Sequence, residues 1–352
     1  MPEAMQPEDR RRVARAISAV ENRADGYQSF LAEAYRLPRW ADVIGITGPP
    51  GAGKSTLMDA LTAHWAAGGA RVAVLAIDPS SPFSGGAVLG DRIRRTRSLG
   101  FENTYFRSLA SRGHLGGLTE TATDLVAVLS LFGFQRVIIE TVGAGQSDVE
   151  IHETADCTVV LTVPGLGDAV QAAKAGLMEI GDVYVLNKAD LPGADAAALD
   201  VERALAAVYS GRPGVNLRRA GETTTTAGSR VLTPGVAALQ RRHGDLGRET
   251  SAWVPPVLRV VATENGQVPE LAAMIDAFVA WSERSGRRAR RTRERAYAQV
   301  LRALSAMLLA PYAREPGSDV LPASVAPWVE RIAAGSASPL EAAQALAKEA
   351  RE

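Results

Sequence analysis

The sequence predicts an α/β protein with a mostly parallel sheet that helices cover on both faces. Seven apolar runs rich in Val and Ile alternate with stretches of helical composition, which is typical of parallel strands joined by helical crossovers. A glycine-rich loop follows the first run directly. The runs occupy residues 43–47, 71–77, 103–109, 136–140, 157–163, 182–187 and 257–262.

Helical segments precede and follow this alternating region. Residues 8–35 have helical composition and end before a proline, and their apolar face carries Val13, Ala16, Ile17 and Val20. After Trp281 the chain is helical again. The last helix is signalled by an N-cap, a first-turn proline and a capping-box acid, which are Ser338, Pro339 and Glu341.

These patterns divide the chain into three parts. We expect an N-terminal helical extension at 1–40, an α/β domain at 41–282 and a C-terminal helical arm at 283–352. The α/β domain carries a long insert at about residues 211–251, because a stretch rich in Gly, Thr and Arg interrupts the alternation there.

Composition indicates an ordinary cytoplasmic protein that binds neither nucleic acid nor membrane. The 352 residues contain 39 Lys and Arg against 39 Asp and Glu, so no overall field attracts an anionic polymer or lipid surface. No apolar run reaches the roughly 18 residues of a membrane span, and the first residues lack a signal-peptide core. The single Cys157, in an apolar run, suits a reducing cytosol as a buried thiol.

An arginine-rich stretch covers residues 284–295 at the start of the C-terminal arm. Charges at a helix start between domains are usually solvated, so we expect these side chains to face solvent or a protein partner rather than nucleic acid. The four histidines are scattered without the spacing of metal ligands.

The strongest motif is the G-x-x-x-x-G-K-S loop between the first strand and its helix. Its glycines let backbone N–H groups converge on phosphate oxygens, and the lysine reaches the β and γ phosphates. The pattern predicts a P-loop NTPase. Its phosphate-binding residues are Gly48, Pro49, Pro50, Gly51, Ala52, Gly53, Lys54, Ser55 and Thr56.

Acidic residues at strand ends predict a Mg²⁺ site beside this loop. Asp78 ends the second apolar run, Asp91 follows in the next connection, and Glu140 ends the fourth run. Mg²⁺ in nucleotide sites takes phosphate oxygens, waters and a few carboxylates, so these three acids are candidate ligands together with the Ser55 hydroxyl. Glu140 stands where nucleotide hydrolases usually place an aspartate, and Gly143 follows it in the motif that faces the γ-phosphate.

The N-K-A-D sequence after the sixth run predicts guanine recognition. The Asp190 carboxylate can accept hydrogen bonds from N1–H and N2–H₂ of guanine, an edge that adenine lacks, so the expected nucleotide is GTP. Asn187 and Lys188 belong to the same motif. A base-capping loop is expected after the last strand, where Ala262 matches only part of the usual Ser-Ala pattern.

The hydrolytic machinery is less complete in the sequence. Lys54, Glu140 and Gln146 are the candidate catalytic residues, with Gln146 either a water-positioning residue or a plain loop amide. A transition-state cation could come from Lys174 or from arginines beside Asp91, although those arginines fit a solvated helix equally well. The incomplete set predicts slow hydrolysis that a partner accelerates.

Five of these segments together resemble one family, the MeaB/ArgK-type GTPases that accompany adenosylcobalamin-dependent acyl-CoA mutases. The likeness spans about residues 10–205 and resumes at WVPPVLRVVA. The segments are GPPGAGKST, AIDPSSPFSGGAVLGDR, ETVGAGQSD, KAGLMEI and NKAD.

The resemblance implies several further properties. In this family the metal-side acids correspond to Asp78, Asp91 and Glu140, and a mobile segment corresponds to residues 165–176. It implies GTP/GDP and Mg²⁺ as cofactors, a homodimer joined by the C-terminal arm, and a chaperone that gates cofactor loading and protects the mutase. A cobalamin adenosyltransferase is a further candidate partner.

Two other functions remain open from the sequence. A nickel- or cobalt-type metallochaperone GTPase would have a related fold, but it would want a Cys/His cluster. An ATP-dependent transport-system kinase would need a different base-reading motif from N-K-A-D.

Overall fold

The computed structural model describes residues 5–78, 98–110, 117–141, 151–165, 177–209, 253–264, 267–313 and 320–349. The chain forms two compact units, Met1–Arg295 and Ala296–Glu352. Helix α11 (Arg287–Leu309) begins in the first unit and continues in the second. None of the described helices combines the length and the apolar character that crossing a membrane requires.

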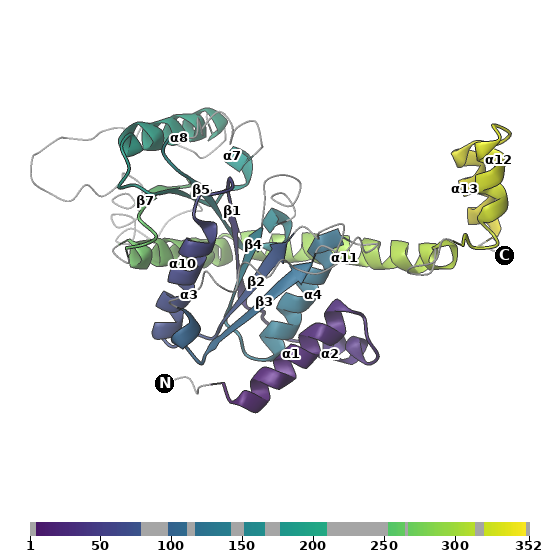
Figure 1. Cartoon of the computed structure of the whole chain (residues 1–352), viewed down its shortest axis with the longest axis horizontal. Coiled ribbons are helices and arrows are strands. Elements are labelled where there is room, and N and C mark those ends of the chain that lie inside the picture. The colour runs from purple at the N-terminus through teal and green to yellow at the C-terminus, as the bar shows by residue number, and fades with distance from the viewer. Residues whose placement is uncertain are drawn as a thin grey trace, which may run out of the picture. The chain divides into compact units, whose positions relative to one another are not determined.

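The first unit is built on one seven-stranded sheet, which confirms the predicted fold class. All neighbouring strands run parallel, in the order β3-β2-β4-β1-β5-β6-β7 (Figure 1). Each predicted apolar run forms a strand, with bounds that differ by a few residues at most. The strands are β1 Asp42–Thr47, β2 Val72–Asp78, β3 Thr104–Ala110, β4 Arg136–Thr141, β5 Cys157–Thr162, β6 Val183–Asn187 and β7 Val257–Val260.

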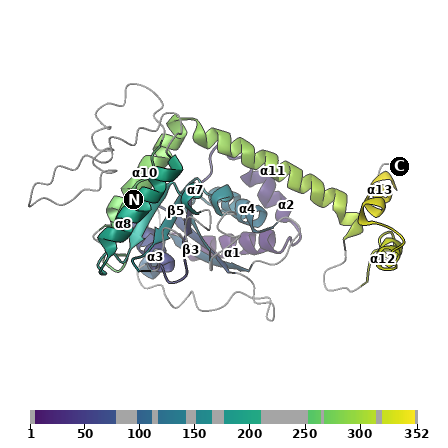
Figure 2. The ribbon, with the colours of Figure 1, turned by 90° about the horizontal axis from the view of Figure 1, so that it is seen from above.

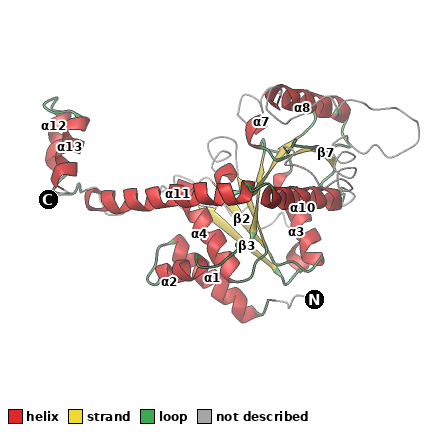
Figure 3. Ribbon diagram, turned by 180° about the vertical axis from the view of Figure 1, so that it is seen from behind, coloured by secondary structure: helices red, strands yellow, loops and turns green. Residues whose placement is uncertain are grey.

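Helices cover both faces of this sheet because successive side chains of a buried strand point to opposite sides. Ile44 of β1 belongs to a core shared with α3 (Lys54–Ala67) and α10 (Val268–Arg284). Val43 belongs to a second core on the other face, under α1 (Pro7–Glu21), α2 (Tyr27–Ala34) and α4 (Gly117–Leu131) (Figure 3). Helices α7 (Leu177–Ile180) and α8 (Ala194–Tyr209) pack over the β5–β6–β7 half (Figure 2).

The N-terminal segment forms two helices rather than the single helical stretch that composition predicts. Helix α1 (Pro7–Glu21) and helix α2 (Tyr27–Ala34) are separated by a turn in which Arg23 has φ 48° and Gly26 has φ 82°. A left-handed backbone interrupts an α-helix, and glycine adopts it at little cost. The predicted apolar face is buried as expected against α4, and it comprises Val13, Ala16, Ile17 and Val20.

The second unit contains the end of α11 and, among the described residues, short helices that follow it. Helix α12 (Ala326–Ala333) and helix α13 (Pro339–Glu349) follow a single 3₁₀ turn at Ala310–Tyr312. The capping box predicted for α13 is present, since Ser338 N donates to Glu341 Oε2 at 2.7 Å and Glu341 N donates to Ser338 Oγ at 3.2 Å. The hydroxyl of Tyr312 donates to the carbonyl of Leu346 at 2.9 Å.

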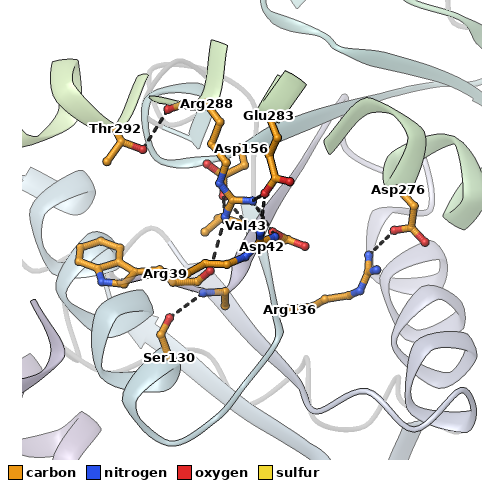
Figure 4. Close-up of polar contacts among 12 residues, drawn as sticks. Arg39, Asp42, Val43, Ser130, Arg136, Asp156, Asp276, Glu283, Arg288 and Thr292 are labelled. Carbon is orange, nitrogen blue, oxygen red and sulfur yellow. Dashed lines mark hydrogen bonds and ion pairs between the residues drawn. The ribbon is translucent and has the colours of Figure 1, made fainter. Parts of the chain in front are cut away.

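Four arginines at the start of α11 are partly buried, so the expectation that this stretch faces solvent is wrong for residues 287, 288, 291 and 295. The other three arginines of the stretch, at 284, 290 and 293, are exposed. Arg288 is only 15% exposed and lies between Asp42, Asp156 and Glu283 (Figure 4). Its Nη1 lies 2.5 Å from Asp42 Oδ1. The other ion pairs of this group join Arg287 to Asp182 at 2.7 Å and Arg295 to Asp156 at 2.5 Å.

The carboxylates of these pairs lie at the amino ends of three strands. Asp42 opens β1, Asp156 precedes β5 and Asp182 precedes β6. Asp156 Oδ2 accepts a hydrogen bond from Val43 N, and Asp182 Oδ2 accepts one from Thr158 N. Asp156 and Asp182 therefore extend the strand ladder while each holds an arginine of α11.

Burial and the arginines act in opposite directions on these acids. Burial alone would raise the pKa of Asp156, but the positive charges of Arg295 and Arg288 outweigh it and the pKa is lowered. For Asp182 burial dominates over the charge of Arg287, so its pKa is raised. Asp156 is thus held as a carboxylate by its two arginines.

His152 lies beside the same arginines and stays neutral. Burial, followed by the positive charge of Arg291 and then by Arg287 and Arg295, lowers the pKa of His152 to about 4. Its Nδ1 lies 3.2 Å from Thr158 Oγ1. A charged imidazole is therefore disfavoured in the folded protein.

We expect His152 to make the protein less stable in mild acid. The unfolded chain takes up the imidazole proton near its ordinary pKa, so stability falls as pH drops from 6.5 towards 4. Between pH 7 and pH 5 the wild type should lose about 1 to 2 kcal/mol through this group. Urea unfolding of the wild type and His152→Asn at both pH values measures the difference, and equal losses in the two proteins would contradict it.

Candidate functional site: a phosphate loop, a carboxylate and an amide bridge

The phosphate-binding loop joins β1 to α3. Glycines at residues 48, 51 and 53 have φ values of 142°, 78° and 88°, which side-chain-bearing residues rarely adopt. A Cβ on Gly48 would lie 2.4 Å from the carbonyl oxygen of Leu161 in β5. The loop therefore passes close to the neighbouring strand, and the first turn of α3 begins directly at Lys54.

Lys54 lies folded over this loop. It is 8% exposed, and its Nζ donates to Gly48 O at 2.7 Å and to Pro49 O at 3.2 Å. The ammonium is thus held above the backbone N–H groups and the positive end of α3, the two features that attract phosphate oxygens.

Ser55 and Glu140 form the oxygen-rich side of the site. Glu140 is 2% exposed near the end of β4, where it pairs with Ile46 of β1 and with Ala76 of β2. The Ser55 hydroxyl donates to Glu140 Oε1 at 2.7 Å. A hydroxyl and a carboxylate this close are a donor set that fits Mg²⁺, which prefers oxygen ligands.

The other predicted metal ligands are only partly placed. Asp78 is the last residue of β2 and pairs with Ala110 of β3, but its side chain is outside the described part of the structure. Within that part, no three His, Cys, Asp or Glu residues gather closely enough to hold a metal ion. The predicted residues Asp91, Gly143 and Gln146 lie outside the described ranges, as do the insert at 211–251, Lys174 and residues 166–176.

Asn187 connects the phosphate loop to the loop after β7. It ends β6 and is 2% exposed. Its Nδ2 donates to Ala52 O at 2.7 Å, and its Oδ1 accepts from Ala262 N at 3.1 Å. A Cβ on residue 53 would lie 2.4 Å from the same Nδ2, which explains the glycine there. One side chain therefore sets the spacing between two loops that belong to different strands.

The rest of the N-K-A-D motif forms a tight turn at the surface. Lys188 has φ 57°, and Ala189 N donates to Val260 O of β7 at 3.2 Å. Asp190 is exposed at this turn. The motif is thus anchored by its buried asparagine and presents its aspartate outward.

Asp59 of α3 makes a buried polar contact close to the site that the sequence does not predict. Its buried carboxylate accepts hydrogen bonds from both the backbone N–H and the hydroxyl of Ser98, the residue that follows the Asp91 segment. The available signal was a single carboxylate among the buried residues of the helix, between Met58 and Ala60. Asp59 ties the end of that segment to the helix that carries Lys54 and Ser55.

The fold and this site define the class of protein. A parallel sheet with β1 at its centre, a phosphate loop between β1 and α3, and a base motif bonded to that loop are the features of a P-loop nucleotide-binding protein of the GTPase type. A family model described as "Methylmalonyl Co-A mutase-associated GTPase MeaB" matches residues 13–315. The chain belongs to this MeaB family of GTPases.

Individual relatives agree with the family. A protein of Pyrococcus abyssi named as a GTPase is 40% identical over 306 residues, which cover 87% of this chain and 83% of that protein. The GTPase ArgK of Escherichia coli is 39% identical over 186 residues, covering 52% and 56% of the two chains. The crystal structure of an LAO/AO transport system kinase superposes with TM-score 0.57 at 24% identity, over 100% of this chain and 99% of that one, and shows a shared fold.

We expect Asn187→Ala to weaken GTP binding and the fold together. The change leaves the buried Ala52 carbonyl and the Ala262 amide without this partner, so unfolding free energy should fall by about 1 to 3 kcal/mol. GTP affinity should fall roughly tenfold or more, because the phosphate and base loops lose their fixed spacing. Calorimetric titration with GTP and urea unfolding measure the two effects.

Asn103→Ala is the matched control for this variant. Asn103 also makes two hydrogen bonds to the backbone through its side-chain amide, but it donates both, to the carbonyls of Ala66 and Ala70 at 2.9 and 2.7 Å. It should lower stability without changing GTP affinity. Wild-type affinity in Asn187→Ala, or an equal loss in Asn103→Ala, would refute the role of the bridge.

Proposed function

We propose that this protein binds GTP with Mg²⁺, hydrolyses it slowly to GDP and phosphate, and uses the cycle as a chaperone of an adenosylcobalamin-dependent acyl-CoA mutase. In this role it gates cofactor loading and protects the mutase from inactivation. The observation that carries the nucleotide part is the Asn187 bridge between the phosphate loop and the base loop. The mutase part is supported by the description of the family.

The residues divide the work of phosphoryl transfer among them. Backbone N–H groups of the loop and Lys54 hold the β and γ phosphates, while Asp190 reads the guanine edge. Ser55 and Glu140 would hold Mg²⁺, which neutralises charge on the phosphates when it is bound. We assign Asp78 and Asp91 to the same metal side and Gln146 to orienting the attacking water, on the basis of their places in the sequence.

The second unit supports a homodimer. Five apolar residues of α11 are exposed and follow the spacing of one helix face: Val300, Leu301, Leu304, Met307 and Leu308. An exposed apolar stripe of this kind indicates an interface. A second copy is the partner that the family resemblance implies, with a cobalamin adenosyltransferase as another candidate, and the buried Cys157 suits work in the reducing cytoplasm.

We expect a cognate mutase to accelerate GTP turnover, and GTP to change mutase binding. Linkage requires that a mutase with a preference for the GTP state binds more tightly when GTP is present, by the same factor. Turnover should rise roughly tenfold with the cognate mutase among methylmalonyl-CoA, isobutyryl-CoA and hydroxyacyl-CoA mutases. The affinity of the protein for the mutase is then measured twice, once with GDP bound and once with a non-hydrolysable GTP analogue bound, and the two values are compared.

Two variants control this experiment. Lys54→Ala removes the phosphate-binding charge and should abolish the nucleotide effect, whereas Asp190→Asn should transfer it from GTP to XTP, because an amide can face the xanthine carbonyl. The chaperone proposal would be overturned if no candidate mutase changed the GTP turnover and if each bound with the same affinity in the presence of GDP and of the GTP analogue. Binding of ATP as tightly as GTP would overturn the base assignment.

We expect charges on the apolar stripe to produce monomers. Leu301→Glu with Leu308→Glu places two carboxylates in the proposed seam, where burying them is costly. Light scattering should report half the mass of the wild type. Gln299→Glu, on the other side of a helix with about 3.6 residues per turn, is the control and should leave the mass unchanged. A double variant of wild-type mass would show that the stripe is not the dimer seam.

A further inference from the structure

The arginines at the start of α11 make two different kinds of contact. Arg287 and Arg288 pair with the carboxylates of strand ends. Arg291 and Arg295 also reach a helical turn at residues 151–154, where Arg291 Nη2 donates to the carbonyl of His152 and Arg295 Nη1 donates to the carbonyl of Thr154 at 3.1 Å. The second kind of contact joins α11 to a particular piece of backbone.

This backbone is the carboxyl end of a helical turn. The last carbonyls of a helix have no partner within it, and they carry the negative end of the helix dipole. Guanidinium groups satisfy both needs, because they donate hydrogen bonds and are always charged. The guanidinium group of Arg295 makes two contacts, because Nη1 donates to the carbonyl of Thr154 in the turn and Nη2 donates to the carboxylate of Asp156. The same carboxylate accepts a hydrogen bond from the backbone N–H of Val43 in β1.

The same turn packs directly on the strand that ends in the phosphate loop. A Cβ on Gly45 of β1 would lie 2.3 Å from Ile151 Cγ2 and 3.0 Å from Ala155 Cβ, so only glycine permits this approach. Ala155 N donates to Ile151 O at 2.8 Å, and Asp156 N donates to Val43 O at 2.8 Å. The turn is therefore clamped between β1 on one side and the arginines of α11 on the other.

The turn also lies at a defined place in the chain. The connection between β4 and β5 begins after Thr141, beside Glu140 with its bond to Ser55, and it ends at this turn before Cys157. One end of the connection is thus fixed at the proposed Mg²⁺ side of the site. The other end is fixed by Gly45, Arg291 and Arg295.

We propose that Arg291 and Arg295 are positioning residues for GTP hydrolysis, which hold the 151–154 turn against β1 and so make the start of α11 responsive to the bound nucleotide. The inference rests on the proposed GTPase function. Neither arginine touches a reacting atom. Each acts through the turn, so its loss alters the rate of hydrolysis more than the affinity for nucleotide.

Arg287 offers a matched control within the same helix. It is half-buried, pairs with Asp182 at 2.7 Å and lies over the ring of Phe278, but no hydrogen bond joins it to residues 151–154 in the described part of the chain. If the arginines only fasten α11 to the sheet, loss of Arg287 and loss of Arg291 have the same consequences. If Arg291 positions the turn, only its loss affects hydrolysis.

The first test separates rate from affinity in the full-length protein. Arg291→Gln should lower kcat for GTP roughly threefold or more, with KM and GDP affinity within about twofold of wild type. Arg291→Lys, which keeps a charged donor, should recover most of the rate, and Arg287→Gln should keep the wild-type kcat even where thermal unfolding shows lower stability. Wild-type kcat in Arg291→Gln, or an equal loss in Arg287→Gln, would overturn the inference.

The second test reads α11 itself. Hydrogen–deuterium exchange of the backbone amides at 287–295 is measured in the GDP-bound protein and in the protein bound to a non-hydrolysable GTP analogue. The wild type and Arg287→Gln should show a nucleotide-dependent difference that Arg291→Gln loses. Equal exchange with both nucleotides, in a protein that binds and hydrolyses GTP, would overturn this inference alone. Absence of GTP binding by calorimetry would overturn the proposed function as well.

Discussion

The side-chain amide of Asn187 is the interaction on which the arrangement of the site depends. An amide has one donor group and one acceptor, and here they fix Ala52 and Ala262 on either side of the end of β6. The phosphate loop starts from the central strand β1, whereas the loop that carries Ala262 follows the edge strand β7. One side chain thus holds together two loops that start from strands three positions apart in the sheet.

Much of the fold could be predicted because its signals are local. Seven buried parallel strands appear as apolar runs, and the phosphate loop and N-K-A-D follow strand ends within a few residues. The sequence alone therefore predicts Lys54, Ser55, Glu140 and Asn187 as site residues. The break between α1 and α2 is harder to predict, because Gly26 is a single glycine within a helical pattern and the left-handed Arg23 carries no comparable sequence signal.

The partners of the α11 arginines could not be predicted for a different reason. A cluster of arginines in a sequence predicts a solvent-exposed surface unless its carboxylate partners are known. Here the partners Asp42, Asp156 and Asp182 come together only through the strand order of the sheet. Asp59 was missed similarly, since its partner Ser98 is distant in sequence. Buried ion pairs gain little net stability after desolvation, so this group matters more for fixing one position of the helix start than for strength.

The buried aspartates also have a consequence for biosynthesis. Their arginines follow 105, 246 and 139 residues later in the chain, in the pairs Asp182–Arg287, Asp42–Arg288 and Asp156–Arg295. A nascent chain that has emerged only through β7 would therefore lack the α11 partners of Asp156 and Asp182, while Asp42 would be paired with Arg39 alone. Contacts so distant in sequence form late. The strand ends of the first unit can therefore complete their native ion pairs only after the ribosome has delivered the beginning of α11.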